Sequence, residues 1–288
     1  MALLIGEFST ALGRIEPGVD RDNAPEAHKL VRAALEEDGT LAEYGINTVL
    51  IGSYKRRVSI RRVKDVDVFC RLEELPANVT SKEILDKFFD VLHTAFGRDS
   101  EGHQRTKRQD RSLQVNFPEF DLYVDAVPAR PHADGSTWEI PKRGEDNDWQ
   151  QTNPDHLTSL TQQMNDAHDG MYVPTVKLLR QTRRALLGAA KPGGFFIEIA
   201  TYQAFATGAV AGQNQAEYYA SALSAVSTLV RNHVDYGLTV GDPTLLGHAL
   251  ITELVVPRSI PTALDMMIHS GKRGATGPLY GVRPNNTA

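Results

Sequence analysis

Residues 63–72 alternate along their whole length, and this segment constrains the fold more than any other feature of the 288-residue sequence. Successive side chains of an extended strand point to opposite faces. One face would carry Val66, Val68 and Cys70, and the other Asp65, Asp67 and Phe69. The valines demand burial, so this strand belongs to a core sheet. Its two acids would repel each other and lose hydration there, which predicts a positive partner between them.

The rest of the pattern predicts an α+β, bilobal fold. We expect a long helix over 24–44, a strand over 47–51, a helix over 81–96 capped by Ser81, and strands over 112–117 and 119–127 joined by a tight hairpin at Pro118. Residues 128–153 are rich in Pro, Gly and Asp and predict a long surface loop. After Pro154 the pattern is helical, with breaks at Gly170, 191–194 and 237–243, and a loose tail from Gly271.

These elements predict two domains. A small mixed sheet with its helices, including the long N-terminal helix, would form a catalytic lobe over 1–165. A helical lobe would follow over 166–288, and the active site would lie in the cleft between the lobes. A chain of this length can bury two modest cores.

Charge is unevenly distributed along the chain. The formal net charge of −5 and the pI of about 6.0 argue against a protein that requires long nucleic acid, without excluding one. Basic residues nevertheless gather in three blocks, at 55–64, 105–111 and 177–184. Such blocks could bind a compact polyanion such as a nucleoside triphosphate, or they could be solvated helix and loop faces.

Cysteine usage and hydropathy indicate a cytoplasmic protein. Cys70 is the only cysteine in the sequence, which excludes an intrachain disulfide and fits a reducing compartment. We interpret it as a small buried hydrophobic residue. No apolar run approaches the roughly 18 residues that span a bilayer, and the N-terminus turns acidic too early for a signal peptide, so we expect no membrane association.

Three carboxylates and a glycine turn predict metal-assisted phosphate chemistry. Asp65 and Asp67 would share one face of a strand and could hold a pair of divalent ions, with Asp125 as a third carboxylate from a neighbouring strand. Asp121 competes with Asp125, because both would lie on one face of the same strand. Gly52-Ser53 follows a strand, and such a turn lets backbone N–H and hydroxyl groups approach an anion.

These residues resemble a known group of enzymes. Residues 51–54, 65–68 and 123–128 resemble the polymerase-beta-like nucleotidyltransferase superfamily in its order of Gly-Ser, paired Asp and third Asp. Within it the chain is most similar to bacterial cGAS/DncV-like nucleotidyltransferases, which make cyclic oligonucleotide signals in anti-phage defence. Softer points of similarity are the segment 149–156, Lys177, and Asp242-Pro243-Thr244.

The resemblance implies a role for each matching residue. Ser53, with Gly52, would bind the β- and γ-phosphates, and Lys177 would contact the triphosphate. Asp65 and Asp67 would bind two Mg²⁺ ions, for which Mn²⁺ could substitute, and Asp125 would bind the catalytic ion. The implied substrates are nucleoside triphosphates, and a downstream effector would respond to the cyclic product.

Two other activities share the same acids. One is a template-independent RNA polymerase or tRNA-end nucleotidyltransferase, and the other transfers a nucleotide to a protein target. A nucleotide-binding scaffold without catalysis is disfavoured, because clustered negative charge beside phosphates gives a mere binder no advantage. For His156 we expect packing or capping, and for Tyr54 and Tyr202 core or surface positions, with base stacking as the alternative.

Overall fold

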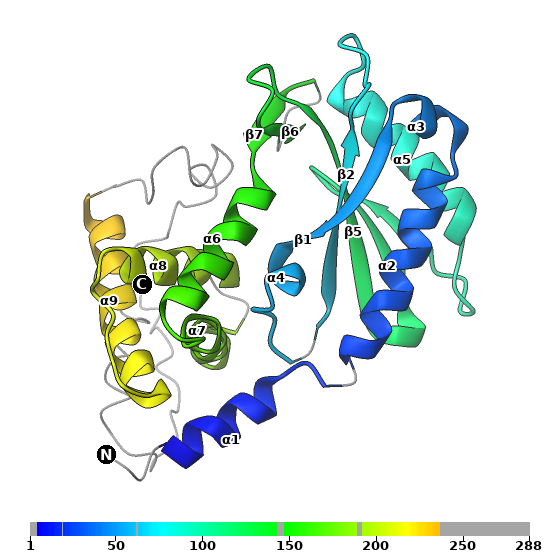
Figure 1. Cartoon of the computed structure of the whole chain (residues 1–288). Helices are drawn as coiled ribbons and strands as arrows, with labels where there is room; N and C mark the ends of the chain where they lie inside the picture. Colours follow the sequence, from blue (N-terminus) through cyan, green and yellow to red (C-terminus); the bar gives the residue numbers. More distant parts are fainter. Residues whose placement is uncertain (1–4, 19, 62, 143–146, 189–191, 237–288) are drawn as a thin grey trace, which may run out of the picture.

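Two separate hydrophobic cores divide the molecule into two lobes. The computed structural model describes residues 5–18, 20–61, 63–142, 147–188 and 192–236. The first core lies between the sheet and its covering helices, and the second lies within the C-terminal helices. Figure 1 shows the sheet and helix α2 on one side and helices α6 to α9 on the other. This arrangement confirms the predicted α+β class with a helical lobe after a mixed sheet.

Within the described residues the sheet has seven strands, five of which form its main path in the order β1-β2-β5-β4-β3. Their bounds are β1 Ile46–Ile51, β2 Asp65–Leu72, β3 Thr106–Arg108, β4 Leu113–Phe117 and β5 Leu122–Pro131. Strands β2 and β5 are parallel, whereas β1 with β2, β3 with β4 and β4 with β5 are antiparallel. The predicted buried face of this segment is confirmed, since Val66, Val68 and Cys70 are all fully buried in the first core. Phe69 on the opposite face is buried as well, and the strand begins at Asp65.

Helices α2 (Asp20–Glu36) and α5 (Ser81–Phe96) pack together over one face of the sheet. The single helix predicted for 24–44 is wrong, because a second helix, α3 (Gly39–Glu43), begins after a break. Asp38 causes this break by capping α3, and its carboxylate accepts a hydrogen bond from Leu41 N at 3.0 Å. The cap of α5 is Thr80 rather than Ser81, in a reciprocal pair with Glu83.

The long loop predicted for 128–153 is also wrong. Strand β5 continues to Pro131, and a hairpin follows, made of β6 (Trp138–Pro141) and β7 (Trp149–Thr152). Aromatic and ionic contacts stabilise this hairpin: the Arg130 guanidinium lies 4.3 Å from the Trp149 ring centre and pairs with Glu139 at 2.7 Å. Turn-forming residues therefore dominate the local composition without preventing strand pairing.

The predicted hairpin at Pro118 is confirmed, but its second strand begins later than expected. A short 3-10 turn, η2 (Pro118–Phe120), leads into Asp121, whose φ of 50° is left-handed. Pairing resumes at Leu122, opposite Phe117. Asp121 is thus an exposed turn residue and does not share a strand face with Asp125, which corrects the expectation that the two compete.

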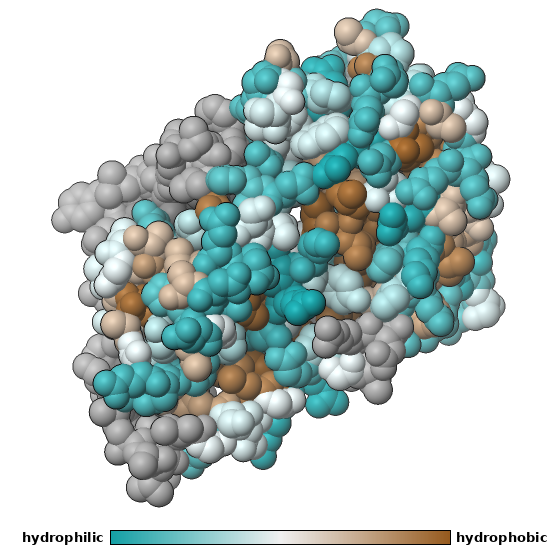
Figure 2. Space-filling model, in the orientation of Figure 1, coloured by the Kyte–Doolittle hydropathy of each residue, from teal (hydrophilic) through white to brown (hydrophobic). Residues whose placement is uncertain are grey.

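The second lobe consists of α6 (Pro154–Ala167), α7 (Tyr172–Leu187), α8 (Gly194–Ala206) and α9 (Gln215–Tyr236). The first described helix, α1 (Ile5–Ile15), packs against α7 and α9 and so contacts the helical lobe. On the face in Figure 2, apolar surface shows in a hollow between the lobes, beside β1.

The domain boundary at 165/166 stays a prediction. The predictions on 237–243, on Asp242-Pro243-Thr244 and on the tail from Gly271 lie outside the described residues. Nowhere in the described ranges does a helix reach the length and apolarity needed to cross a bilayer.

Candidate active site

The register of two parallel strands brings the predicted acids together. Strand β2 carries Asp65 and Asp67, and the central strand β5 carries Asp125, with Asp67 directly beside Asp125. Burial alternates around the acids: their strand neighbours Val66, Val68, Val124 and Ala126 enter the core, and the acids lie on the other face. The prediction that carboxylates from two neighbouring strands meet is therefore consistent with the observed pairing.

The Gly52-Ser53 turn lies against the same acids. Ile51, the last residue of β1, pairs with Asp67, and the short helix α4 (Gly52–Lys55) begins immediately afterwards. Gly52 has a φ of +72°, and a Cβ built on it would overlap the Asp67 carboxylate. Glycine is therefore required here for both backbone conformation and space. Ser53 Oγ lies 3.1 Å from Ser59 Oγ, which holds the hydroxyl beside the turn.

Burial and mutual repulsion make the two inner acids hard to ionise. Burial, then the charge of Asp65, raises the pKa of Asp67 to about 6, against the opposing effect of Arg56 and Arg180. Burial, then the charges of Asp67 and Asp65, raises the pKa of Asp125 to about 7. Like charges in a partly dry site disfavour one another's ionised form. A bound cation would remove this penalty.

The donor set fits a hard divalent cation. All three side chains offer carboxylate oxygens, the ligands that Mg²⁺ prefers. Asp125 Oδ1 is buried without a hydrogen-bond partner, as expected for an atom whose natural partner is an ion. In the described ranges no three acidic, histidine or cysteine side chains already surround one point as metal ligands. Binding would therefore have to draw the carboxylates together, Asp65 above all, because it is exposed at the start of β2.

Helix α7 places the Arg180 guanidinium in the electrostatic field of the acids, three residues after Lys177. Burial lowers the pKa of Arg180, while Glu198, Asp65 and Asp67 all act to raise it, so its guanidinium lies in their field. Lys177, one turn earlier, is buried and donates from Nζ to Glu16 at 2.5 Å. The role of Lys177 at the triphosphate remains a prediction, and the sequence analysis included Arg180 only as part of the basic block at 177–184.

A buried ionic cluster joins the two lobes next to this site. Arg56, at the end of α4, donates from Nε and Nη2 to the carboxylate of Glu198 on α8, at 2.5 and 3.1 Å. Arg180 Nη1 lies 3.5 Å from the same carboxylate. The Glu198 side chain is only 1% exposed. Part of the basic block at 55–64 is therefore structural, because Arg56 neither faces solvent nor is free to bind a ligand.

Two further polar residues of the site escaped the sequence analysis. Gln114 on β4 lies opposite Asp125, and its hydrogen bond to that carboxylate acts to lower the pKa. Tyr123 pairs with Asp65, and burial together with the three acids raises its pKa to about 12. The alternation of buried residues along β4 and β5 was the available signal, because it turns both side chains toward the acids.

The other singled-out residues have structural positions. Tyr54 packs against the first core and Tyr202 against the second. The His156 backbone N–H donates to the Asn153 side chain at 3.0 Å in the cap of α6. Cys70 is fully buried, as predicted.

Comparison with known proteins places this site in a family. Residues 3–165 match the model of the SMODS domain, described as Second Messenger Oligonucleotide or Dinucleotide Synthetase domain. The chain belongs to this family. The matched range contains all of β1 to β7, and with them every predicted acid and the Gly52-Ser53 turn.

Individual relatives agree with the assignment. A Cyclic AMP-AMP-AMP synthase from Acinetobacter sp. is 30% identical over 202 residues, which are 67% of this chain and 56% of that protein. The chain thus spans little more than half the length of this relative. Among solved structures, GTP-bound Vibrio cholerae DncV has a TM-score of 0.68 at 10% identity, covering 91% of this chain and 86% of that one. The CD-NTase CdnG of Bradyrhizobium diazoefficiens, in complex with GTP, has a TM-score of 0.67 at 15% identity, covering 91% and 88%. These two structures share the fold.

Proposed function

We propose that this SMODS protein is a magnesium-dependent nucleotidyltransferase that joins nucleoside triphosphates into a cyclic oligonucleotide and releases pyrophosphate. The observation that carries the proposal is the pairing of Asp67 with Asp125 on parallel strands, directly beside the Gly52-Ser53 turn. Acids that repel one another beside an anion-binding turn suit a site completed by cations and phosphates.

Each acid has a defined part in this proposal. Asp65 and Asp67 would hold two Mg²⁺ ions, with Mn²⁺ as a possible substitute, and Asp125 would help to hold the catalytic ion. Bound magnesium supplies charge neutralisation on the phosphates and eases deprotonation of that hydroxyl. The ribose oxygen forms a bond to the α-phosphorus as the bond to pyrophosphate breaks, and Asp125 favours loss of the hydroxyl proton.

Basic and hydroxyl groups on both lobes orient the triphosphate. Ser53 and the N–H groups of its turn bind the β- and γ-phosphates from the sheet side. Arg180 approaches from α7 of the helical lobe, and its position in the field of Asp65 and Asp67 supports this role. Lys177 is the second α7 cation for the phosphates, provided that it exchanges its contact with Glu16 for the ligand.

Adenine nucleotides are the first substrates to test, because the Acinetobacter relative is a Cyclic AMP-AMP-AMP synthase. The product would act on a downstream effector in the cytoplasm, as a signal in defence against phage. Long nucleic acid is not required by this mechanism, since both reacting groups belong to nucleotides. The net charge of −5 is consistent with that view.

The test is a product assay on the full chain. Purified protein is incubated with α-labelled ATP, alone and with the other triphosphates, in Mg²⁺ or Mn²⁺, and then treated with phosphatase. We expect a small labelled product that resists phosphatase. Label on added RNA would indicate an end-adding polymerase, and label on protein would indicate nucleotidylation of a target.

Matched variants separate the metal site from general effects of charge. Asp65→Asn with Asp67→Asn should abolish turnover, because neither ion is then held. Asp121→Asn removes the charge of an exposed turn acid, in a left-handed conformation that Asn tolerates, and should leave turnover unchanged. Turnover in the double variant would refute the proposed metal site.

A further inference from the structure

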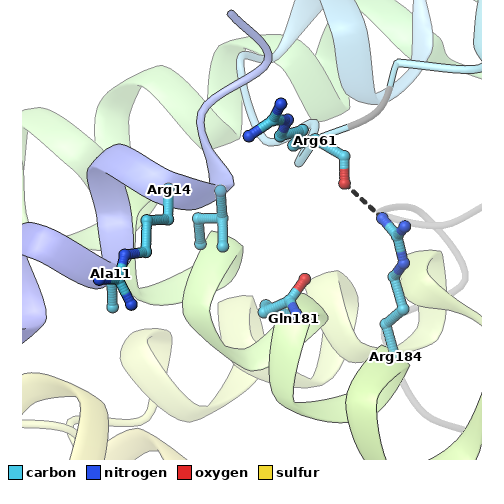
Figure 3. A pocket seen from close by; sticks show the side chains of 6 residues that line it. Ala11, Arg14, Arg61, Gln181 and Arg184 are labelled. Carbon is cyan, nitrogen blue, oxygen red and sulfur yellow. Dashed lines mark hydrogen bonds between the residues drawn. The ribbon is translucent and has the colours of Figure 1, made fainter.

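A basic cavity lies apart from the acids and the Gly52-Ser53 turn. It has a volume of about 590 Å³ and is bounded by helix α1, the segment that follows α4, and helix α7. Its lining consists of Ala11, Arg14, Ile15, Arg61, Gln181 and Arg184. Figure 3 shows these side chains around an open space. We call this cavity the three-arginine pocket. None of the three catalytic acids lines it.

The pocket carries positive charge that no carboxylate of the described residues neutralises. Its lining contains three arginines and no carboxylate. Across the described ranges, none of these three guanidiniums forms an ion pair; Arg184 donates only to the Arg61 backbone carbonyl. Glu16, next in sequence to the lining residue Ile15, is already bound by Lys177. In a chain with a net charge of −5, such a cluster attracts anions.

The frame of the pocket is fixed, whereas its charges lie at the rim. Arg61 N donates to Ile15 O at 2.7 Å, which ties the segment after α4 to the end of α1. Ile15, Ile60 and Leu178 form a small buried cluster beneath this contact. The three arginines are exposed, and Figure 3 shows that they come from three different segments around the opening. A ligand with several separated negative charges matches this layout better than a single phosphate does.

We propose that the three-arginine pocket binds a small anion with several phosphate groups, at a site distinct from the catalytic acids. Guanidinium groups bind phosphate oxygens through paired N–H donors. The Gln181 amide adds a neutral donor and acceptor, and Ala11 and Ile15 provide an apolar floor for the body of a nucleotide. The chemistry fits a nucleoside triphosphate and a cyclic oligonucleotide equally, so the experiment has to distinguish these two sources.

The test measures binding without turnover. Isothermal titration of the full chain with inorganic tripolyphosphate in EDTA avoids the metal-dependent site. Arg14→Gln, Arg61→Gln and Arg184→Gln together should weaken binding about tenfold or more, since three exposed charge contacts are lost. A matched control, Lys29→Gln with Arg98→Gln and Lys107→Gln, removes three exposed charges elsewhere and should change affinity by less than about twofold.

Two further variants keep the result interpretable. Arg14→Gln with Arg61→Gln preserves the Arg184 side chain and its bond to the Arg61 carbonyl, so weaker binding by this double variant cannot reflect loss of that bond. Ser53→Ala, in the catalytic turn, should retain binding. Thermal unfolding of each protein verifies that it is folded.

Repeating the titration with ATP and with a cyclic adenine trinucleotide identifies the source. Tighter binding of either one, lost in the pocket variant, assigns the ligand to substrate or to product. Equal losses in the pocket and control variants, loss in Ser53→Ala, or absence of binding by all three probes would overturn the proposal. Because the test needs neither magnesium nor turnover, its outcome is independent of the proposed activity.

Discussion

The glutamate that joins the lobes offers the sharpest test of the electrostatics. Glu198 is 1% exposed and holds two guanidiniums, those of Arg56 and Arg180, at 2.5 and 3.5 Å. Glu198→Gln keeps the side-chain volume but leaves both guanidiniums without a charged partner in the lobe interface. Removing one partner of a buried ion pair costs about 3–5 kcal/mol. For a protein of this size, that loss corresponds to a decrease in Tm of roughly 6–20 °C.

The matched control is a partly exposed pair of the same chemistry. Glu119 pairs with Arg105 at 2.9 Å, and its side chain is 44% exposed. Glu119→Gln should cost no more than about 1 kcal/mol, because solvent screens the pair. Urea denaturation followed by circular dichroism gives both values. The double variant Arg56→Gln with Glu198→Gln should cost less than the sum of its single changes.

A similar small loss in Glu198→Gln and Glu119→Gln would refute this reasoning. It would mean that water reaches the lobe interface and screens the cluster, so that the ion pairs contribute little to holding the lobes together. Loss of turnover without loss of stability would likewise assign Glu198 to the chemistry instead of to the interface.

Three other predictions concern the candidate active site. Gly52→Ala should abolish turnover in the product assay, because the new methyl group overlaps Asp67. The control Gly97→Ala, also at positive φ but with open space around it, should lower only the stability measured by thermal unfolding. Arg180→Gln should raise KM for ATP about tenfold, and Lys177→Gln less, in steady-state kinetics; the reverse order would give the triphosphate contact to Lys177. The pKa values of Asp67 and Asp125 are raised above the ordinary 3.8, to about 6 and about 7, so their ionisation removes stability as pH rises from about 4 through 7. Added Mg²⁺ should therefore raise Tm more at pH 8 than at pH 5, and an equal gain at both pH values would count against the metal site.

Local patterns predicted the parts of the site that lie on single strands. The alternation around Asp65 and Asp67 identified a half-buried strand, and the strand before Gly52 identified the turn. These features depend on neighbouring residues only, and for that reason one sequence reveals them. The same local patterns predicted most of the sheet. Asp38, which caps α3, is also a local signal, but the apolar periodicity over 24–44 favoured a single helix.

Contacts between distant segments could not be predicted in this way. Arg56 and Glu198 are separated by 142 residues, and only the folded chain shows that they meet. Gln114 joins the site through its position opposite Asp125, which depends on strand register. Arg180 was overlooked because it and Lys177 lie on one helix, and sequence alone does not tell which of them faces the acids.

The parallel pairing of β2 with β5 also determines how much of a growing chain must be synthesised before the acids can come together. Asp67 and Asp125 meet only after α5 and the β3–β4 hairpin have been made and placed beside them, because parallel neighbours need a crossover. Such long-range contacts form late and slowly. A ribosome-bound fragment that ends before Leu122 would hold Asp65 and Asp67 yet lack the central strand β5, and so would lack the third acid, Asp125.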